Sequence, residues 1–163
     1  MSHEGPAIFR FAVTAAMLSS PPVTLPFTKM NGAGNDFILV DDRANRLALT
    51  PAEVARLCHR QRGIGADGFL RLIPCADRTA DWAWDFYNSD GSQAEMCGNG
   101  ARCFARFIQR LTGVQERVTF VTVAGVITAT FRGEQVTVTL TVPRELRLDQ
   151  WIEVGGMRGV SIR

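Results

Sequence analysis

The most restrictive feature of the sequence is residues 136–142, where apolar and polar side chains alternate strictly as Val-Thr-Val-Thr-Leu-Thr-Val. Successive side chains of a strand point to opposite faces, so this run predicts a strand over Gln135–Val142 with one buried face. Pro143 ends it. Arg117–Val121 and Val126–Phe131 are further strand-like runs. The region that follows Gly113 is therefore predicted to consist of strands.

Two helices are predicted before that region. Thr50 can cap a helix that begins with Pro51, and Glu53 completes the capping pattern, so we expect a helix to about Arg60. Apolar residues at spacings of three and four predict a second helix from about Gly98 to Leu111, with a stripe of Phe104, Phe107, Ile108 and Leu111. Further strands are expected at Phe37–Val40, Phe69–Ile73 and Trp82–Tyr87. The class is α+β with more strand than helix.

Composition excludes several classes of protein. Hydrophobic residues make up 46% and charged residues 21% of the 163 residues, which excludes wholesale disorder and a fibrous chain. The net charge of +2 argues neither for nor against nucleic acid, and because basic residues form no polybasic patch we expect no nucleic-acid partner. No apolar stretch approaches the roughly 20 residues of a membrane span, so no membrane partner is expected. The four cysteines suggest no disulfide framework.

The first residues differ from the rest of the chain. An apolar run at Ala7–Leu18 is followed by Ser-Ser-Pro-Pro, which neither a helix nor a central strand would continue through. One interpretation is a secretory signal, but Glu4 interrupts its basic region and the apolar run is short. The other is a dispensable extension, with Met17 as the true start. We expect residues 1–25 to be a disordered extension and exclude them from the fold.

The strongest candidate for chemistry is the segment Met-Cys-Gly-Asn-Gly-Ala-Arg at residues 96–102. Cys97 is expected where a helix begins, a position that favours the thiolate form of a cysteine. Gly98 and Gly100 leave the backbone bare, so its N–H groups can approach an anion such as a carboxylate. Cys97 is therefore either a nucleophile or base beside an anion cradle, or a buried structural cysteine before a glycine-rich turn.

Two other glycine-rich segments, residues 31–36 and 62–68, are weaker signals. A Gly-x-Gly pair before a strand is more often a turn than a ligand cradle. Neither segment fits a dinucleotide fingerprint or a phosphate-binding loop. No Cys-x-x-Cys occurs, so we expect no metal site, and His59 is interpreted as a residue of a helix face. Four loop or strand carboxylates could act as acids or bases but are more often solvated or capping, namely Asp67, Asp85, Asp90 and Glu95.

Together these segments resemble the diaminopimelate epimerase family. The resemblance rests on Phe27–Phe37, Gly63–Gly68, Phe86–Ser92 and Met96–Cys103, and it extends from about Pro26 to the end. The order and spacing are those of the family's N-terminal half, and Cys-Gly-Asn-Gly-Ala-Arg is highly specific. The resemblance implies a strand-rich, barrel-like sheet wrapped around the helix that follows Cys97.

The resemblance also implies a function. It implies cofactor-independent interconversion of LL- and meso-diaminopimelate on the lysine and peptidoglycan route. Inverting a Cα–H centre without a carbonyl cofactor calls for a base on one face and an acid on the other, which two cysteines supply. By position, Cys97 is the proton donor of that pair. Residues that match substrate-binding positions of the family are Asn35, Asn88, Gly98 and Asn99.

In the family, the second catalytic cysteine belongs to a C-terminal half, which we do not expect in these 163 residues. We therefore interpret 26–142 as the N-terminal lobe and 143–163 as the start of a second lobe, and expect an unpaired sheet edge. Cys103 lies about 240° around the helix from Cys97 and cannot serve as the second thiol. A non-catalytic fragment or half of a split enzyme, and a proline racemase-like enzyme, remain alternatives. The resemblance further implies a cytoplasmic protein, homodimeric when full length.

Overall fold

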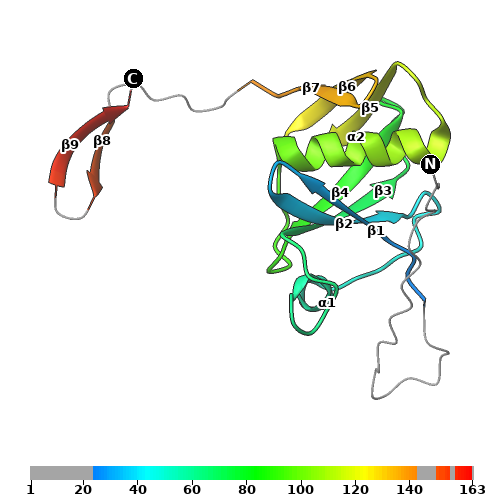
Figure 1. Ribbon diagram of the computed structural model, residues 1–163, viewed down its shortest axis with the longest axis horizontal. Helices are drawn as coiled ribbons and strands as arrows, with labels where there is room; N and C mark the ends of the chain where they lie inside the picture. Colours follow the sequence, from blue (N-terminus) through cyan, green and yellow to red (C-terminus); the bar gives the residue numbers. More distant parts are fainter. Residues whose placement is uncertain (1–23, 143–149, 155–156, 163) are drawn as a thin grey trace.

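The computed structural model of the protein describes residues 24–142, 150–154 and 157–162 (Figure 1). Nine strands and two helices occur in these residues. In chain order they are β1 (Thr28–Gly32), β2 (Asn35–Asp41), α1 (Pro51–Cys58), β3 (Gly68–Ile73), β4 (Trp82–Asn88), α2 (Gly98–Thr112), β5 (Arg117–Thr122), β6 (Gly125–Arg132), β7 (Gln135–Thr139), β8 (Gln150–Val154) and β9 (Met157–Ile162). The α+β prediction is confirmed. The predicted extension lies almost wholly outside the described residues, although Leu25 packs against the core.

Seven strands form one sheet in the order β1 to β7, which curls around α2 (Figure 1). Strands β2 and β3 are parallel, as are β4 and β5, and the other neighbours are antiparallel. Each parallel pair is connected by a helix, and such crossovers are almost always right-handed. Because the two pairs point in opposite directions while the sheet grows in one sense, right-handed crossovers place α1 and α2 on opposite faces.

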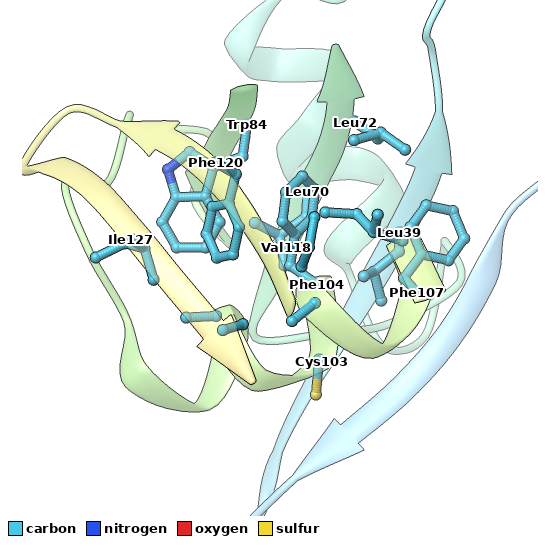
Figure 2. Close-up of a cluster of buried hydrophobic side chains, with 14 of the residues drawn as sticks. Leu39, Leu70, Leu72, Trp84, Cys103, Phe104, Phe107, Val118, Phe120 and Ile127 are labelled. Carbon is cyan, nitrogen blue, oxygen red and sulfur yellow. The ribbon is translucent and has the colours of Figure 1, made fainter. Parts of the chain in front are cut away.

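The larger core lies between α2 and the concave face of the sheet. Helix α2 contacts β1, β2, β3, β5, β6 and β7, which confirms the predicted sheet wrapped around a central helix. Phe104 stacks edge to face against Trp84 and Phe120, with ring centroids 5.6 Å and 5.0 Å apart (Figure 2). The predicted stripe of α2 is buried at Phe104, Phe107 and Ile108. Leu111 differs, because it lies in the last turn and is 37% exposed.

The smaller core lies between α1 and the other face. Val54 and Cys58 of α1 pack with residues of β2 and β3. Strand β2 is buried on both faces, which explains why residues 37–40 form a continuous apolar run. Arg71 is also buried on this face, where it pairs with Asp42 at 3.1 Å and Asp85 at 3.5 Å.

Strand β7 is shorter than the alternating run predicts. It ends at Thr139, the last residue paired with β6. Val136 and Val138 are half-buried against the core, but Leu140 is 59% and Val142 83% exposed. The alternation continues past the last residue that pairs with β6, and the expected buried face is wrong for Leu140 and Val142. In the described part of the chain β1 and β7 each pair on one side only, as expected for an open edge.

Strands β8 and β9 are not part of the seven-stranded sheet and form a separate antiparallel hairpin. Neither helix in the described residues has the length and apolarity that would be needed to cross a membrane.

Candidate functional site

The predicted site residues gather at one end of the seven-stranded sheet. Strands β2 and β3 begin at this end and β4, which is antiparallel to β3, ends there. In register, Phe37 pairs with Gly68 and Gly68 pairs with Asn88. Asn35 is the first residue of β2 and Asn88 the last of β4. The loop that follows β4 leads to the N-terminus of α2, so the candidate residues of three segments share this end.

Cys97 is the N-cap of α2, as its place in the sequence predicts. Its backbone is extended, its carbonyl accepts from the Ala101 N–H at 2.8 Å, and its Sγ accepts from the Gly100 N–H at 3.4 Å. The side chain packs at the border of the larger core but is only partly buried. Because its side chain is only partly buried, Cys97 does not fit the alternative of a buried structural cysteine.

The first turn of α2 can accept an anion. It contains no acidic residue. In the described residues the N–H groups of Gly98 and Asn99 have no hydrogen-bond partner, as is usual for the first residues of a helix. These N–H groups and the positive end of the helix dipole make such a terminus a site for carboxylates or phosphates.

The side chains of Asn35 and Asn99 contact each other directly. The Asn99 Nδ2 donates to the Asn35 Oδ1 at 2.7 Å, across 64 positions of sequence. Asn35 Nδ2 in turn donates to the Asp67 carboxylate at 3.4 Å, and Arg102 donates to Asn99 Oδ1. Asn88 lies at the same end of the sheet, but its Nδ2 donates to Ser92 at 3.0 Å in its own turn.

A cluster of ion pairs lies next to Asn35 and consists of Lys29, Asp36, Arg60 and Asp67. Arg60 donates to both oxygens of Asp36 at 2.9 Å and 3.0 Å and to Asp67 at 2.7 Å. Lys29 pairs with Asp36 at 3.0 Å and donates to the Gly65 carbonyl. The hydrogen bonds from Arg60, helped by Lys29, hold the pKa of the Asp36 carboxyl far below its usual range. The cluster connects β1 and β2 to the glycine-rich segment before β3.

The first glycine-rich segment is a hairpin turn, in agreement with the interpretation as a turn. Ala33 and Gly34 both have positive φ, of 53° and 95°, which is typical of the two-residue turn that joins twisted strands. Gly32 allows a close approach to α2, because a Cβ there would lie 2.8 Å from Cys103 Sγ and 3.0 Å from the Asn99 carbonyl oxygen. The hairpin is thus seated directly against the site helix.

The other cysteines have different environments. Cys103 is buried against Gly32 inside the fold, and burial raises the pKa of its thiol. Burial, reinforced by Asp36, raises the pKa of Cys58 to about 11. The burial of Cys103 is consistent with the expectation that it does not supply a second thiol at this site. Cys75 lies in the loop between β3 and β4, where it donates to Asp77 at 3.0 Å.

Other polar candidates have local structural roles. The His59 Nδ1 accepts from the N–H groups of Gln61 and Arg62 just after α1. Asp90 accepts from Ser92 in the turn after β4. No group of metal-ligating side chains is found among the described residues. No local pattern indicates the contact of Asp67 with Asn35, because the two residues lie 32 positions apart, whereas Arg102 contacts Asn99 within one turn of α2.

Comparisons with known proteins decide the family. A sequence model described as diaminopimelate epimerase matches residues 27–144. This chain belongs to the diaminopimelate epimerase family. It is 42% identical over 153 residues to the diaminopimelate epimerase of Synechococcus sp. (strain JA-3-3Ab), covering 83% of this chain and 53% of that relative. It is 49% identical over 108 residues to that of Synechocystis sp. (strain ATCC 27184 / PCC 6803 / Kazusa), covering 65% of this chain and 38% of the relative.

Two further facts follow from the comparisons. The chain spans about half the length of the curated relatives it matches. A hydroxyproline epimerase from Agrobacterium vitis, solved with bound trans-4-hydroxy-L-proline, has a similar fold, with a TM-score of 0.59 and 18% identity over 78% of this chain and 44% of that structure. At this identity the likeness concerns the fold alone.

Proposed function

We propose that this chain carries the first half of a cofactor-independent epimerase that converts LL- to meso-diaminopimelate, with Cys97 as one member of a two-cysteine acid–base pair. The observation that supports this most directly is the position of Cys97. It is a partly exposed thiol at the N-cap of α2, beside backbone N–H groups that no side chain of the first turn occupies. Family membership supports diaminopimelate as the amino acid that such a site would hold.

The first turn of α2 supplies binding and charge stabilisation. In this proposal the N–H groups of Gly98 and Asn99 receive the α-carboxylate of the substrate. Proton removal from Cα places negative charge on that carboxylate, so the same N–H groups bind the transition state more strongly than the substrate. Asn35 and Asn88, at the adjoining strand ends, would hold the remaining polar groups.

In this proposal Cys97 exchanges a proton with one face of the substrate Cα. A thiol there donates a proton to the carbanion-like centre while a thiolate on the opposite face removes the original proton, and the roles reverse in the other direction. The second thiol is not expected from Cys58 or Cys103, which are buried. We therefore propose that inversion needs a complementary C-terminal half. From the family resemblance we also propose a cytoplasmic location, a place in lysine biosynthesis, and a homodimer for the protein that contains both halves.

A chimera tests this proposal. Residues 27–142 would replace the aligned segment of the Synechococcus relative, and inversion of LL-diaminopimelate would be followed by deuterium incorporation from D2O. We expect the chimera to invert the substrate, and C97A to abolish inversion. C75S serves as the control, because Cys75 lies in a loop away from the site and should leave the rate unchanged. The 163-residue chain alone should show no inversion.

Three results would contradict this proposal. A folded chimera that acts on proline and not on diaminopimelate would favour the racemase alternative. Inversion that survives C97A would remove Cys97 from the mechanism. If the chimera does not fold, amide NMR shifts of Gly98 and Asn99 in the 163-residue chain on adding diaminopimelate test binding directly. Unchanged shifts at millimolar ligand would count against the cradle.

A further inference from the structure

Four side chains from three segments form a continuous chain of hydrogen bonds across the site. The Asp67 carboxylate, just before β3, accepts from Asn35 Nδ2 at the start of β2 at 3.4 Å. Asn35 Oδ1 accepts from Asn99 Nδ2 in the first turn of α2 at 2.7 Å. Asn99 Oδ1 accepts from the guanidinium of Arg102, one turn further along α2. The chain therefore runs from an anion to a cation through two neutral amides.

The charged ends determine the orientation of both amides. An ionised carboxylate can only accept hydrogen bonds, and a guanidinium can only donate them. Asn35 must therefore direct its NH2 group toward Asp67, which leaves its oxygen for Asn99. Asn99 must direct its oxygen toward Arg102, which leaves its NH2 for Asn35. A flip of either amide would place oxygen against oxygen at one contact and NH2 against NH2 at another.

The anionic end of this chain is itself held in place. Asp67 accepts from the guanidinium of Arg60 at 2.7 Å and from the backbone N–H of Asp36 at 3.1 Å. The Asp67 backbone N–H donates back to the Asp36 carboxylate at 3.1 Å and to the Asp36 carbonyl at 2.9 Å. These reciprocal contacts fix the Asp67 carboxylate relative to the first residues of β2. It cannot rotate away from Asn35 without breaking several hydrogen bonds.

The cationic end stands beside the proposed anion cradle. The Arg102 Nη1 lies 3.8 Å from the position that a Cβ would take at Gly98. Arg102 is thus next to the backbone N–H groups at the start of α2. Its hydrogen bond to Asn99 joins two residues of the same helix terminus, so it also restrains the Asn99 backbone.

We propose that Asp67 and Arg102 are positioning residues that lock the amides of Asn35 and Asn99 in one orientation. This inference rests on the proposed function, because its consequence concerns the substrate. With one N–H committed to Asp67, Asn35 keeps a second N–H as a donor for a carboxylate of an amino-acid substrate. The lock removes the flipped state, in which donor and acceptor positions are exchanged, before the ligand arrives. Pre-organisation of this kind reduces the free-energy cost of binding.

The test measures the Asn99 side-chain amide by NMR in the 163-residue chain. The Asn99 side chain makes its hydrogen bonds to Asn35 and Arg102 and not to Asp67, so a change at Asn99 on mutating Asp67 reports the hydrogen bonds between them. In D67N, residue 67 no longer dictates the amide orientation of Asn35, and we expect the Asn99 NH2 signal to shift. We expect its exchange with water to rise about fivefold, the effect of losing one neutral hydrogen bond. D77N is the control, because Asp77 also accepts neighbouring hydrogen bonds but lies in the loop after β3.

Two further variants separate positioning from a general structural role. The double variant N35D/D67N should return the Asn99 signal toward that of the parent, because a carboxylate at position 35 accepts from both neighbours. R102M should shift the Asn99 signal and R102K should restore it in part. R106M is the matched control on the same helix, since Arg106 donates to Gln109 and Gly133. If D67N does not fold, the R102M and R102K pair decides the question.

Binding of meso-diaminopimelate gives the functional readout. We expect D67N and R102M to weaken binding about tenfold, as for losing a hydrogen bond to a charged group, while D77N and R106M leave it unchanged. If Asn99 responds as expected but the parent binds no diaminopimelate, the proposed function fails and the positioning role stands. An Asn99 signal in both D67N and R102M that matches the controls would overturn the positioning role, whatever the binding result.

Discussion

The two helices of the described fold begin in opposite ways. At α1, Thr50 Oγ1 accepts from the Glu53 N–H at 3.3 Å, and the Glu53 carboxylate accepts from the Thr50 N–H at 2.8 Å. At α2, the N-cap is the thiol of Cys97, a weak acceptor 3.4 Å from its donor, and the first turn has no acidic residue. The first helix satisfies its own terminus, whereas the second leaves part of its terminus open.

This difference separates a structural terminus from a functional one. A capping box contributes to stability and occupies the position where an anion would bind. At α2 the chain gives up that contribution, and Gly98 and Gly100 lower the helix propensity further. The larger core compensates, because α2 is held by packing across six strands. A helix terminus that binds an anion needs free N–H groups, which a weak N-cap leaves open. It also needs packing elsewhere on the helix to compensate for the stability lost at the cap.

Substitution by alanine should have different effects at two glycines near the helix starts. Gly91, in the turn after Asn88, has a φ of +84°, and a Cβ there would lie 2.0 Å from the Pro51 carbonyl oxygen at the start of α1. A Cβ at Gly98 would lie 3.6 Å or more from its neighbours. We expect G91A to lower the free energy of unfolding by about 3 kcal/mol, because strain and a backbone clash combine. The free energy of unfolding of G98A should lie within about 0.5 kcal/mol of that of the parent, or above it.

Urea unfolding of the two variants beside the parent measures both effects. The pair is matched, since each variant adds one methyl group beside a helix terminus. A G91A protein as stable as the parent would mean that the turn bearing Asn88 is not seated on α1. A large loss in G98A would mean that the first turn of α2 has less space than its geometry indicates.

The cysteines at the two helices should differ in reactivity. Cys58 ends α1 with a pKa of about 11, so at pH 8 about one molecule in a thousand is thiolate. Cys97 starts α2 and is partly exposed. We expect iodoacetamide to modify Cys97 at least about tenfold faster than Cys58, with Cys103 also slow because burial raises its pKa. Peptide mass spectrometry over a time course assigns each rate.

Cys75 provides the control for exposure alone, because it is also partly exposed but lies in a loop. If the N-terminus of α2 adds to the effect of exposure, Cys97 should react faster than Cys75 by about twofold to fivefold. Equal rates would mean that exposure, and not the helix, governs Cys97. Labelling of Cys58 as fast as Cys97 in the folded protein would contradict the burial of Cys58.

Local patterns predicted the elements well and the contacts between them poorly. The capping pattern at Thr50 and the apolar stripe that ends before Gly113 both predict helices, because each depends on neighbouring residues. The alternation through Leu140 predicts a buried face, but β7 stops pairing at Thr139 although β6 continues to Gly125, and Leu140 is 59% exposed. Burial there depends on which other segment lies alongside, and alternation within one strand carries no information about its neighbours.

The candidate site shows the same division. Cys97 was predicted at a helix start from its glycine-rich surroundings, and the structure confirms that position. The link from Asp67 through Asn35 to Asn99 joins segments 32 and 64 residues apart, and nothing local to any of the three residues indicates it. Gly32 is a similar case. A side chain at this position would clash only because β1 packs closely on α2, a contact between distant segments of the sequence.

Acid should affect the two helix starts differently. Hydrogen bonds from Thr50 lower the pKa of Glu53 below its ordinary value of 4.5. A carboxyl with a depressed folded-state pKa contributes stability above its unfolded pKa and loses it as the pH falls through the folded value. We expect E53Q to be less stable than the parent near pH 7 and to lose less stability between about pH 5 and pH 3. Urea midpoints across that range measure the difference, and Asp36 and other carboxyls with lowered pKa set the common background.

At α2 the parent has no carboxylate to titrate, so G98E should introduce the same dependence there. A carboxylate at position 98 would face the open N–H groups and the helix dipole, which favours its ionised form. G98E should therefore lose more stability than the parent between about pH 5 and pH 3, while occupying the cradle and weakening diaminopimelate binding. Parallel stability curves for G98E and the parent would show that the terminus of α2 has no preference for an anion, and the contrast between the two helices would then reduce to packing alone.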